Sequence, residues 1–277
     1  MTETLRLSST AELGLDELAS LFNEAYQGYE IPQHVDAGAV VFMHEALDLV
    51  PERSCVAWRG DRPVGLGMLG VRASRGWVGG MGVVPEARRS GVGEALMRGL
   101  IDHARGAGVR TLFLEVLETN AGARALYEKL GFRAFRRLEV LAWEGEPRGH
   151  DPSVIACEPK AARHRIAARR AAPEPWQRAD ETVDRLDVST PALRAVTSPH
   201  GDAVYRVTEG RASVLQLAAR DADAAGALLD SIRAKPGVML LRFLNVPADD
   251  PGAEALRGRG ATCIAAQTEM SVEVATL

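Results

Sequence analysis

The sequence has little cysteine, few aromatic residues and no long apolar run. Three of its 277 residues are cysteines, and aromatic residues make up 5%. Cys55, Cys157 and Cys263 are odd in number, lie roughly a hundred residues apart and show no metal-ligand or redox spacing. We therefore expect reduced thiols packed in the core, with neither a disulfide framework nor a metal site.

An excess of basic charge is also missing. The formal net charge is −4, which argues against a dedicated nucleic-acid-binding protein. No window holds the roughly 18 uninterrupted apolar residues that a membrane span needs. The opening MTETLRLSST lacks the basic and apolar regions of a secretion signal. We expect a cytoplasmic protein whose partners include neither a membrane nor nucleic acid.

What the sequence does contain is an alternation of strand and helix patterns. Strand patterns with β-branched and alternating residues are interrupted by segments with apolar residues at helical spacing. This order predicts an α/β or α+β fold with a mixed central sheet and flanking helices. The expected strands of the first half are 3–8, 54–60, 63–73, 76–85, 109–118 and 132–143, and the expected helices are 14–26, 36–50, 92–106 and 121–131.

The composition changes near residue 146. Seven Lys or Arg and three acids lie between Arg148 and Arg178, together with several prolines. A phosphate or RNA surface would explain this charge, and so would a solvated helix face beside a connector. Strand and helix patterns then resume up to Val274, which we expect to lie at the end of two final strands. We expect domains at 1–145 and 188–277, with 146–187 forming a connector and the start of the second domain.

The segment PEARRSGVGEALMRGL, residues 85–100, has the composition of an anion-binding helix start. A helix N-terminus has about four unpaired N–H groups and roughly half a positive charge. Glycines at 91 and 93 let an anion approach the backbone, and Arg88 can add charge-assisted hydrogen bonds. A glycine-tolerant helix start with surface arginines is the alternative. A dinucleotide fingerprint matches only in part, because Leu96 stands where its third glycine belongs.

Two spaced motifs decide between these interpretations. Arg88-x-x-Gly91-x-Gly93 is followed about 27 residues later by NAGARALYEKLGF, residues 120–132. Together they resemble the GNAT (GCN5-related N-acetyltransferase) family, and the resemblance covers roughly residues 4–143. It implies a mixed sheet in which strands near 78–84 and 111–117 splay apart to admit the pantetheine arm of acetyl-CoA. Glycines in 79–84 would allow the bulge usual in that strand.

The resemblance also implies roles for individual residues. The strand backbone near Met81 and Val83 would meet the thioester oxygen. Asn120 would contact the pantetheine region, although it could equally cap the next helix. The residues that would hold the pyrophosphate are Arg88, Arg89, Ser90, Gly91, Val92 and Gly93.

Direct attack by an amine needs a base and a proton for the leaving thiolate. Tyr127 would be the general acid, unless it only packs against its helix neighbours. Glu115 would be the base by its spacing to Tyr127, unless it is a strand glutamate that pairs with an arginine. Glu118 and Glu30 are the alternatives for this role.

The acceptor amine would bind elsewhere. Residues 23–32 lie where GNAT proteins place the loop over the acceptor pocket, so Tyr26, Tyr29 and Glu30 could line an amine site. This loop varies so much in the family that it identifies no acceptor.

The second half looks like a degenerate copy of the first. Aligning the halves places Asp223 at Gly91, Ala225 at Gly93 and Leu256 at Tyr127. The resemblance therefore extends to a tandem GNAT protein with a degenerate C-terminal domain, the alternative being an unrelated α/β partner domain.

Two functions follow from these observations. The first is an acetyl-CoA-dependent N-acetyltransferase that acts on a primary amine of a small molecule or peptide. The second is a non-enzymatic acyl-CoA-binding regulatory protein. Retention of Tyr127 favours the enzyme, and the sequence leaves a homodimer open.

Overall fold

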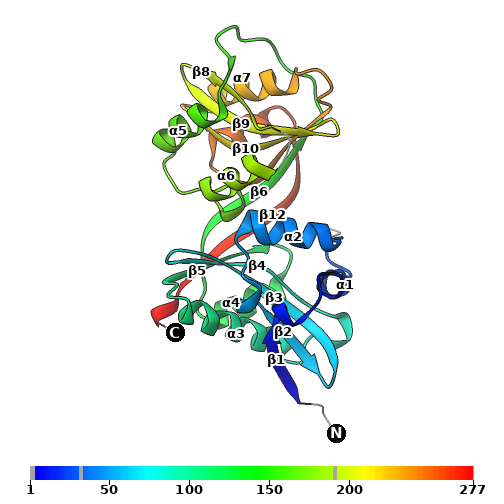
Figure 1. The fold of residues 1–277 in the computed structure, drawn as a ribbon. Helices are drawn as coiled ribbons and strands as arrows, with labels where there is room; N and C mark the ends of the chain where they lie inside the picture. Colours follow the sequence, from blue (N-terminus) through cyan, green and yellow to red (C-terminus); the bar gives the residue numbers. More distant parts are fainter. Residues whose placement is uncertain (1–3, 31–33, 190–191, 277) are drawn as a thin grey trace. The chain divides into compact units, whose positions relative to one another are not determined.

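The computed structural model describes residues 4–30, 34–189 and 192–276. The chain divides into two compact units, one of residues 1–135 with 269–277 and one of residues 136–268 (Figure 1). These limits differ from the sequence-based expectation of 145 and 187. The reason is that β6 (Arg133–Trp143) and β12 (Thr262–Glu273) each contribute residues to both units.

The first unit is built on a mixed sheet. Four strands follow one another antiparallel, and the fifth runs parallel to the fourth. The end of β12 completes this unit: the Thr111 hydroxyl donates to Glu273 at 2.9 Å, and the Val274 amide donates to the Arg110 carbonyl at 2.7 Å. The five strands are β1 (Leu5–Ser9), β2 (Cys55–Arg59), β3 (Arg62–Arg72), β4 (Arg75–Val83) and β5 (Thr111–Leu117).

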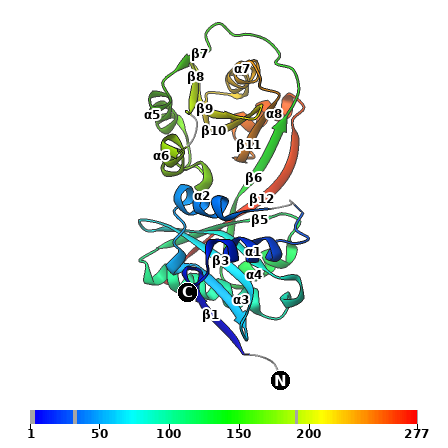
Figure 2. The same cartoon turned by 45° about the vertical axis from the view of Figure 1, so that its right-hand side comes forward.

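Helices cover both faces of this sheet (Figure 2). On one face, Gly65 and Gly67 bring β3 so close to α3 (Val92–Gly106) that a Cβ would meet Leu96 and Leu100. On the other face, a Cβ at Gly82 would lie 2.9 Å from Ala25 at the end of α1. The remaining helices of the unit are α1 (Leu15–Ala25), α2 (Ala37–Leu47) and α4 (Ala121–Lys129).

Strands β4 and β5 part after three residue pairs. The last pair is Trp77 with Phe113. Immediately beyond it, the register of β3 and β4 shifts between Met68 and Leu69, which leaves Gly79 as the extra residue of a β-bulge. The bulge and the splay predicted from the sequence are both confirmed.

The second unit repeats the element order of the first. Its strands run β6, β11, β10, β9, β8 and β7 across the sheet, and β10 and β11 are the parallel pair. Residues 262–273 form one strand where we expected two, since this stretch contains no glycine or proline to turn the chain. The other elements are β7 (Ile155–Cys157), α5 (Pro159–Arg169), α6 (Asp180–Ser189), β8 (Arg194–Ser198), β9 (Gly201–Thr208), β10 (Arg211–Ala219), α7 (Ala222–Arg233), β11 (Leu240–Pro247) and α8 (Pro251–Gly258), with short 3-10 turns at Thr10–Glu12, Pro51–Arg53, Pro85–Ala87, Trp176–Arg178 and Val274–Thr276.

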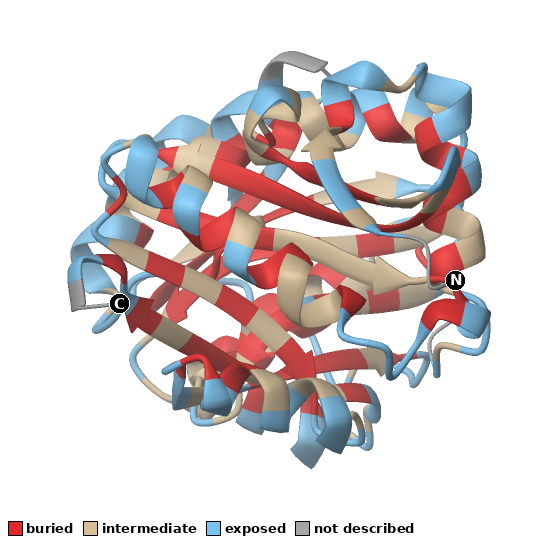
Figure 3. Ribbon diagram, turned by 90° about the horizontal axis from the view of Figure 1, so that it is seen from below, coloured by how far each residue is buried: buried red, intermediate tan, exposed pale blue. Residues whose placement is uncertain are grey.

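The basic segment belongs to this second unit, and most of its arginines form ion pairs. Arg163, Arg165 and Arg170 form ion pairs with Asp184, Asp202 and Asp180. Buried residues lie along the strands and the inner sides of the helices (Figure 3). None of the helices in the described ranges is long and apolar enough to cross a membrane.

Candidate active site

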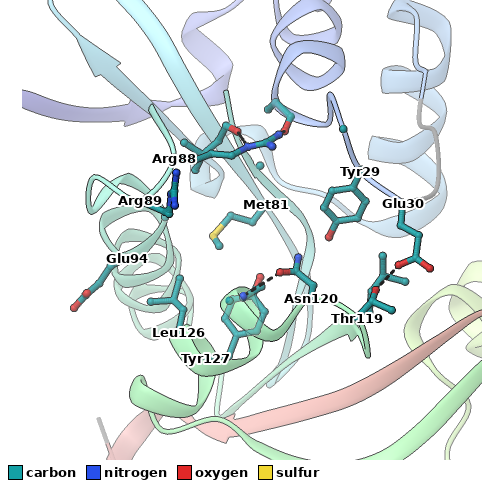
Figure 4. A pocket seen from close by; sticks show the side chains of 18 of the residues that line it. Tyr29, Glu30, Met81, Arg88, Arg89, Glu94, Thr119, Asn120, Leu126 and Tyr127 are labelled. Atoms are coloured by element: carbon teal, nitrogen blue, oxygen red, sulfur yellow. Dashed lines mark hydrogen bonds between the residues drawn. The ribbon is translucent and has the colours of Figure 1, made fainter. Parts of the chain in front are cut away.

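The opening between β4 and β5 leads to a cavity of about 740 Å³ in the first unit (Figure 4). Its wall combines the α3 start, the end of β4, the β5–α4 loop and the segment after α1. Of the predicted site residues, eight line it: Met81, Val83, Arg88, Arg89, Gly91, Gly93, Asn120 and Tyr127. Tyr29 and Glu30 of the expected acceptor loop line it as well.

The α3 helix presents an uncapped N-terminus to this cavity. Gly91 is its N-cap, with φ at 86°, and has no side chain that could bond the first amides. By contrast, the Asn120 side chain caps α4, because it accepts a 3.1 Å hydrogen bond from the Ala123 amide. The predicted capping role of Asn120 is therefore confirmed. A Cβ at Gly91 would touch nothing within 4 Å. The α3 amides are therefore open to an anion.

Ser90 and Val92 do not line the cavity. The Ser90 hydroxyl donates to the Ala87 carbonyl at 2.6 Å and accepts from Arg59. Val92 is 1% exposed, beneath the sheet. Both side chains stabilise the start of α3, so only the backbone amides of Ser90 and Val92 are available to bind a ligand.

The Arg88 side chain, which we predicted to bind the pyrophosphate, bonds backbone carbonyls in this structure. Its guanidinium donates to three backbone carbonyls, those of Val83 at 3.0 Å, Ala25 at 3.2 Å and Gln27 at 2.6 Å. The Ala25 carbonyl ends the α1 helix, where carbonyls lack helical partners, and Gln27 lies just beyond the C-cap Tyr26. Arg88 thus ties the acceptor-loop side of the cavity to the end of β4.

Glu94 lines the cavity although the sequence analysis did not identify it. An acid in the first turn of α3 would repel a phosphate, but Lys129 and Arg98 lie 2.6 and 2.9 Å from its carboxylate. Their hydrogen bonds lower the pKa of Glu94. In the sequence, the i,i+4 spacing of Glu94 and Arg98 would have indicated that this carboxylate is paired.

Tyr127 is 7% exposed, and its ring lies 6.0 Å from that of Phe132. Its phenol has no hydrogen-bond partner within the described ranges, while Figure 4 places its side chain beside Asn120 and Leu126 on the cavity wall. Burial raises the pKa of the Tyr127 phenol above its ordinary value, so the phenol is protonated at neutral pH.

Tyr26 occupies the opposite side of β4. Its ring stacks on Phe22 at 4.3 Å, and a Cβ at Gly80 would lie 3.0 Å from its hydroxyl. Burial raises the pKa of Tyr26, and a hydrogen bond with the Met81 backbone acts in the opposite sense. The absence of a side chain at Gly80 therefore lets the Tyr26 phenol reach the β4 backbone near Met81, where we expected a backbone amide to bind the thioester oxygen.

Glu30 and Thr119 connect the acceptor loop to the β5–α4 loop. The Thr119 hydroxyl donates to the Glu30 carboxylate, and both residues line the cavity (Figure 4). Residues 31–33 of this predicted loop lie outside the described ranges. Thr119 had not been identified from the sequence.

Glu115 is not among the residues that line the cavity. It lies on β5, two residues beyond Phe113, and accepts a 2.9 Å hydrogen bond from the Trp77 indole. The first of its sequence-based alternatives, Glu118, does not line the cavity either.

Comparison with known proteins identifies the first unit. The model of the acetyltransferase (GNAT) family matches residues 15–132. Residues 15–132 are a GNAT domain. The two spaced motifs recognised in the sequence lie within this match.

Solved structures extend the likeness in fold to nearly the whole chain. A GCN5-related N-acetyltransferase from Sphaerobacter thermophilus has a TM-score of 0.74 at 14% identity, covering 98% of this chain and 96% of that one. A tandem GNAT protein from the clavulanic acid biosynthesis pathway has a TM-score of 0.65 at 16% identity, covering 98% and 99%. The mixed α/β fold of the GNAT type is thereby confirmed.

Curated relatives match over a shorter stretch. The [ribosomal protein bS18]-alanine N-acetyltransferase of Escherichia coli is 54% identical over 50 residues, which are 18% of this chain and 34% of that protein. The corresponding Salmonella typhimurium protein is 40% identical over 79 residues, 28% of this chain and 51% of that protein. The chain thus spans about a third to a half of these relatives.

The helix that corresponds to α3 in the second unit has a different start. The α7 helix is capped by Asp221, whose carboxylate accepts from the Ala224 amide at 2.9 Å. This hydrogen bond lowers the pKa of Asp221. Counted from the N-caps, Asp221 rather than Asp223 stands at the position of Gly91 in the GNAT domain. In either alignment a carboxylate takes the place of a glycine that we predicted to lie at the pyrophosphate.

In the second unit, β10 and β11 pair in parallel only as far as Val214 and Phe243, and an arginine fills the splay beyond this pair. Arg178, 1% exposed, donates to the carbonyl of the bulged Leu215 in β10 at 2.9 Å and to that of Asn245 in β11 at 3.2 Å. Its guanidinium carbon lies 4.3 Å from the Phe243 ring centre, and Glu174 is 3.1 Å away. A thioester arm would have to displace this buried ion pair.

Proposed function

We propose that the chain is an acetyl-CoA-dependent N-acetyltransferase whose first unit transfers the acetyl group to a primary amine. The observation that carries this proposal is the convergence of three features on one cavity: the splay of β4 and β5, the uncapped α3 start and the buried phenol of Tyr127. The GNAT match of residues 15–132 supports the choice of acetyl-CoA as the co-substrate.

In the proposed reaction, the α3 amides bind the pyrophosphate and the thioester lies in the splay. The amine nitrogen attacks the acetyl carbonyl, so that a C–N bond forms and the C–S bond breaks. The Met81 backbone amide interacts with the Tyr26 phenol in this structure. In the reaction this amide would instead donate a hydrogen bond to the thioester oxygen. Tyr127 protonates the leaving thiolate and regains its proton from solvent.

The amine must lose a proton before or during attack, because an alkyl ammonium with a pKa near 10.4 is almost fully charged at neutral pH. We propose Glu115, acting through water, as the base. The position of Glu115 supports this role, because it lies two residues beyond Phe113, the last β5 residue paired with β4, where the two strands begin to separate. Glu30 on the cavity wall is a carboxylate that could attract a cationic acceptor.

Release of free CoA thiol from acetyl-CoA tests the proposal. We expect amine-dependent thiol release with at least one member of a panel of peptides with free N-termini, polyamines and aminoglycosides. An alanine-starting peptide belongs in the panel, since the curated relatives are named for a ribosomal-protein alanine. Tight acetyl-CoA binding with no acceptor-dependent release would instead support a non-enzymatic acyl-CoA-binding protein.

One acetyl-CoA per chain is the expected binding stoichiometry. The Asp221 cap and the Arg178 ion pair oppose a second site. Calorimetric titration of the full chain should give a stoichiometry near one. Two sites of similar affinity would show that the second unit is a working domain and that the proposed correspondence of the units is wrong.

A further inference from the structure

One face of the second unit's sheet carries a row of arginines across three strands. Arg206 in β9 is registered with Ser213 in β10, and Ser213 with Arg242 in β11. Residues in register share a face, and so does Arg211, two residues before Ser213. Neighbouring strands lie about 4.8 Å apart, so Arg206 and Arg242 flank Ser213 closely. We call Arg206, Arg211, Ser213 and Arg242 the arginine row.

The cluster that packs against α7 lies on the opposite face of these strands. The alternating residues Tyr205, Ala212, Val214, Leu241 and Phe243 belong to the buried cluster. The row lies on the side of α5, whose Arg165 bonds Asp202 further along β9. All four residues of the row are half-buried, which leaves each of them partly open to solvent.

The guanidinium groups of the row have no acidic partner in the described part of the chain. The Nε–H groups of Arg211 and Arg242 are buried and donate no hydrogen bond within the described residues. Burial, followed by the charge of Arg211, lowers the pKa of Arg206, and no carboxylate acts on it. Two other arginines of this unit have partners within the chain itself: Arg259 pairs with Asp230 at 2.6 Å, and Arg233 donates to the carbonyls of Val238 and Glu144.

Half-buried like charges without partners destabilise a fold, and a bound anion would compensate them. Guanidinium forks match phosphate oxygens, and the Ser213 hydroxyl adds a donor at the centre of the row. A phosphate dianion has enough acceptors for three arginines, whereas a carboxylate has two oxygens and one charge. We propose that the arginine row binds a phosphate group, free or as the monoester of a small molecule. This site goes beyond the proposed acetyl transfer and does not depend on it.

Titration of the full chain with inorganic phosphate tests the site, with sodium chloride keeping the ionic strength constant. The titration is repeated with Gly91→Asp, so that any contribution of the α3 start is recognised. We expect phosphate to raise the melting temperature of the wild type, because a ligand of the native state stabilises it. Arg206→Gln and Arg242→Gln should each weaken phosphate binding at least tenfold. Arg194→Gln is the matched control: Arg194 is exposed on the adjacent β8, in register with the core residue Tyr205.

A second readout separates ligand binding from a structural role. Without phosphate, Arg206→Gln should be at least as stable as the wild type, since it removes one of two neighbouring like charges. O-phosphoserine tests the monoester: tighter binding than that of phosphate identifies an organic ligand, and weaker binding identifies the free anion. The proposal is overturned if phosphate binds the wild type no more tightly than Arg206→Gln, if that variant is less stable without phosphate, or if the row binds RNA but not phosphate.

Discussion

Tyr127→Phe is expected to lower single-turnover acetyl transfer by about 10²- to 10⁴-fold, the range typical of general acid catalysis. The substitution deletes only the hydroxyl, so the ring keeps its packing near Phe132 and the fold should be preserved. Affinity for acetyl-CoA and the acceptor KM should change little, because the interaction is made chiefly in the transition state. Single-turnover measurement avoids a masking contribution from product release.

The expected pH dependence of acetyl transfer follows from the raised pKa of Tyr127. Burial disfavours the phenolate and raises this pKa above the ordinary value near 10. The phenol therefore stays protonated from pH 6 to 9, and any fall of the wild-type rate in that range must come from another group. Loss of the acid itself should appear only above about pH 10.

Tyr205→Phe provides the matched control for this prediction. Tyr205 is a 2% exposed phenol in the core of the second unit, and burial raises its pKa as well. Its replacement should leave acetyl transfer unchanged. If Tyr127→Phe likewise transfers acetyl groups at the wild-type rate across pH 6 to 9, then Tyr127 has only a packing role.

Features that depend on local backbone physics could be predicted from the sequence. Glycines at 91 and 93 in front of an amphipathic helix predicted an anion-binding start, and the structure contains an uncapped helix there with Gly91 at a positive φ. The glycine run around Gly79 predicted the bulge that opens the sheet. Both depend on residues within a few positions of one another, so the sequence pattern carries them.

Features that depend on distant partners could not be predicted in this way. The Arg88 guanidinium binds the carbonyls of Ala25 and Gln27, some sixty residues earlier in the chain. Arg178 fills the splay of the second unit from a segment that its composition suggested was a connector. The end of β12 joins the first unit from the far end of the chain. A local pattern shows that an arginine is present, but only the fold shows which groups it meets.

Gly91→Asp is expected to weaken acetyl-CoA binding at least tenfold. The carboxylate would stand at the N-cap of α3, where the pyrophosphate should bind, and would both repel it and compete for the first amides. Charge-assisted hydrogen bonds contribute about 1.5–3 kcal/mol each, and about 1.4 kcal/mol already corresponds to a tenfold change in Kd. The second unit carries this arrangement naturally, since Asp221 caps α7. Calorimetric titration with acetyl-CoA at two ionic strengths measures the effect, which should shrink at high salt.

Gly91→Asn separates the charge from the backbone. Gly91 has φ at 86°, and asparagine and aspartate are the residues that best tolerate the left-handed region after glycine. Because a Cβ at this position meets nothing within 4 Å, both side chains have space. The two variants should therefore lose similar stability, while only the aspartate should lose most of the acetyl-CoA affinity. Equal affinities for both folded variants and the wild type would show that the start of α3 does not hold the pyrophosphate. Equal losses in both would show that binding depends on free amides or on the backbone conformation at Gly91, and that charge repulsion contributes little.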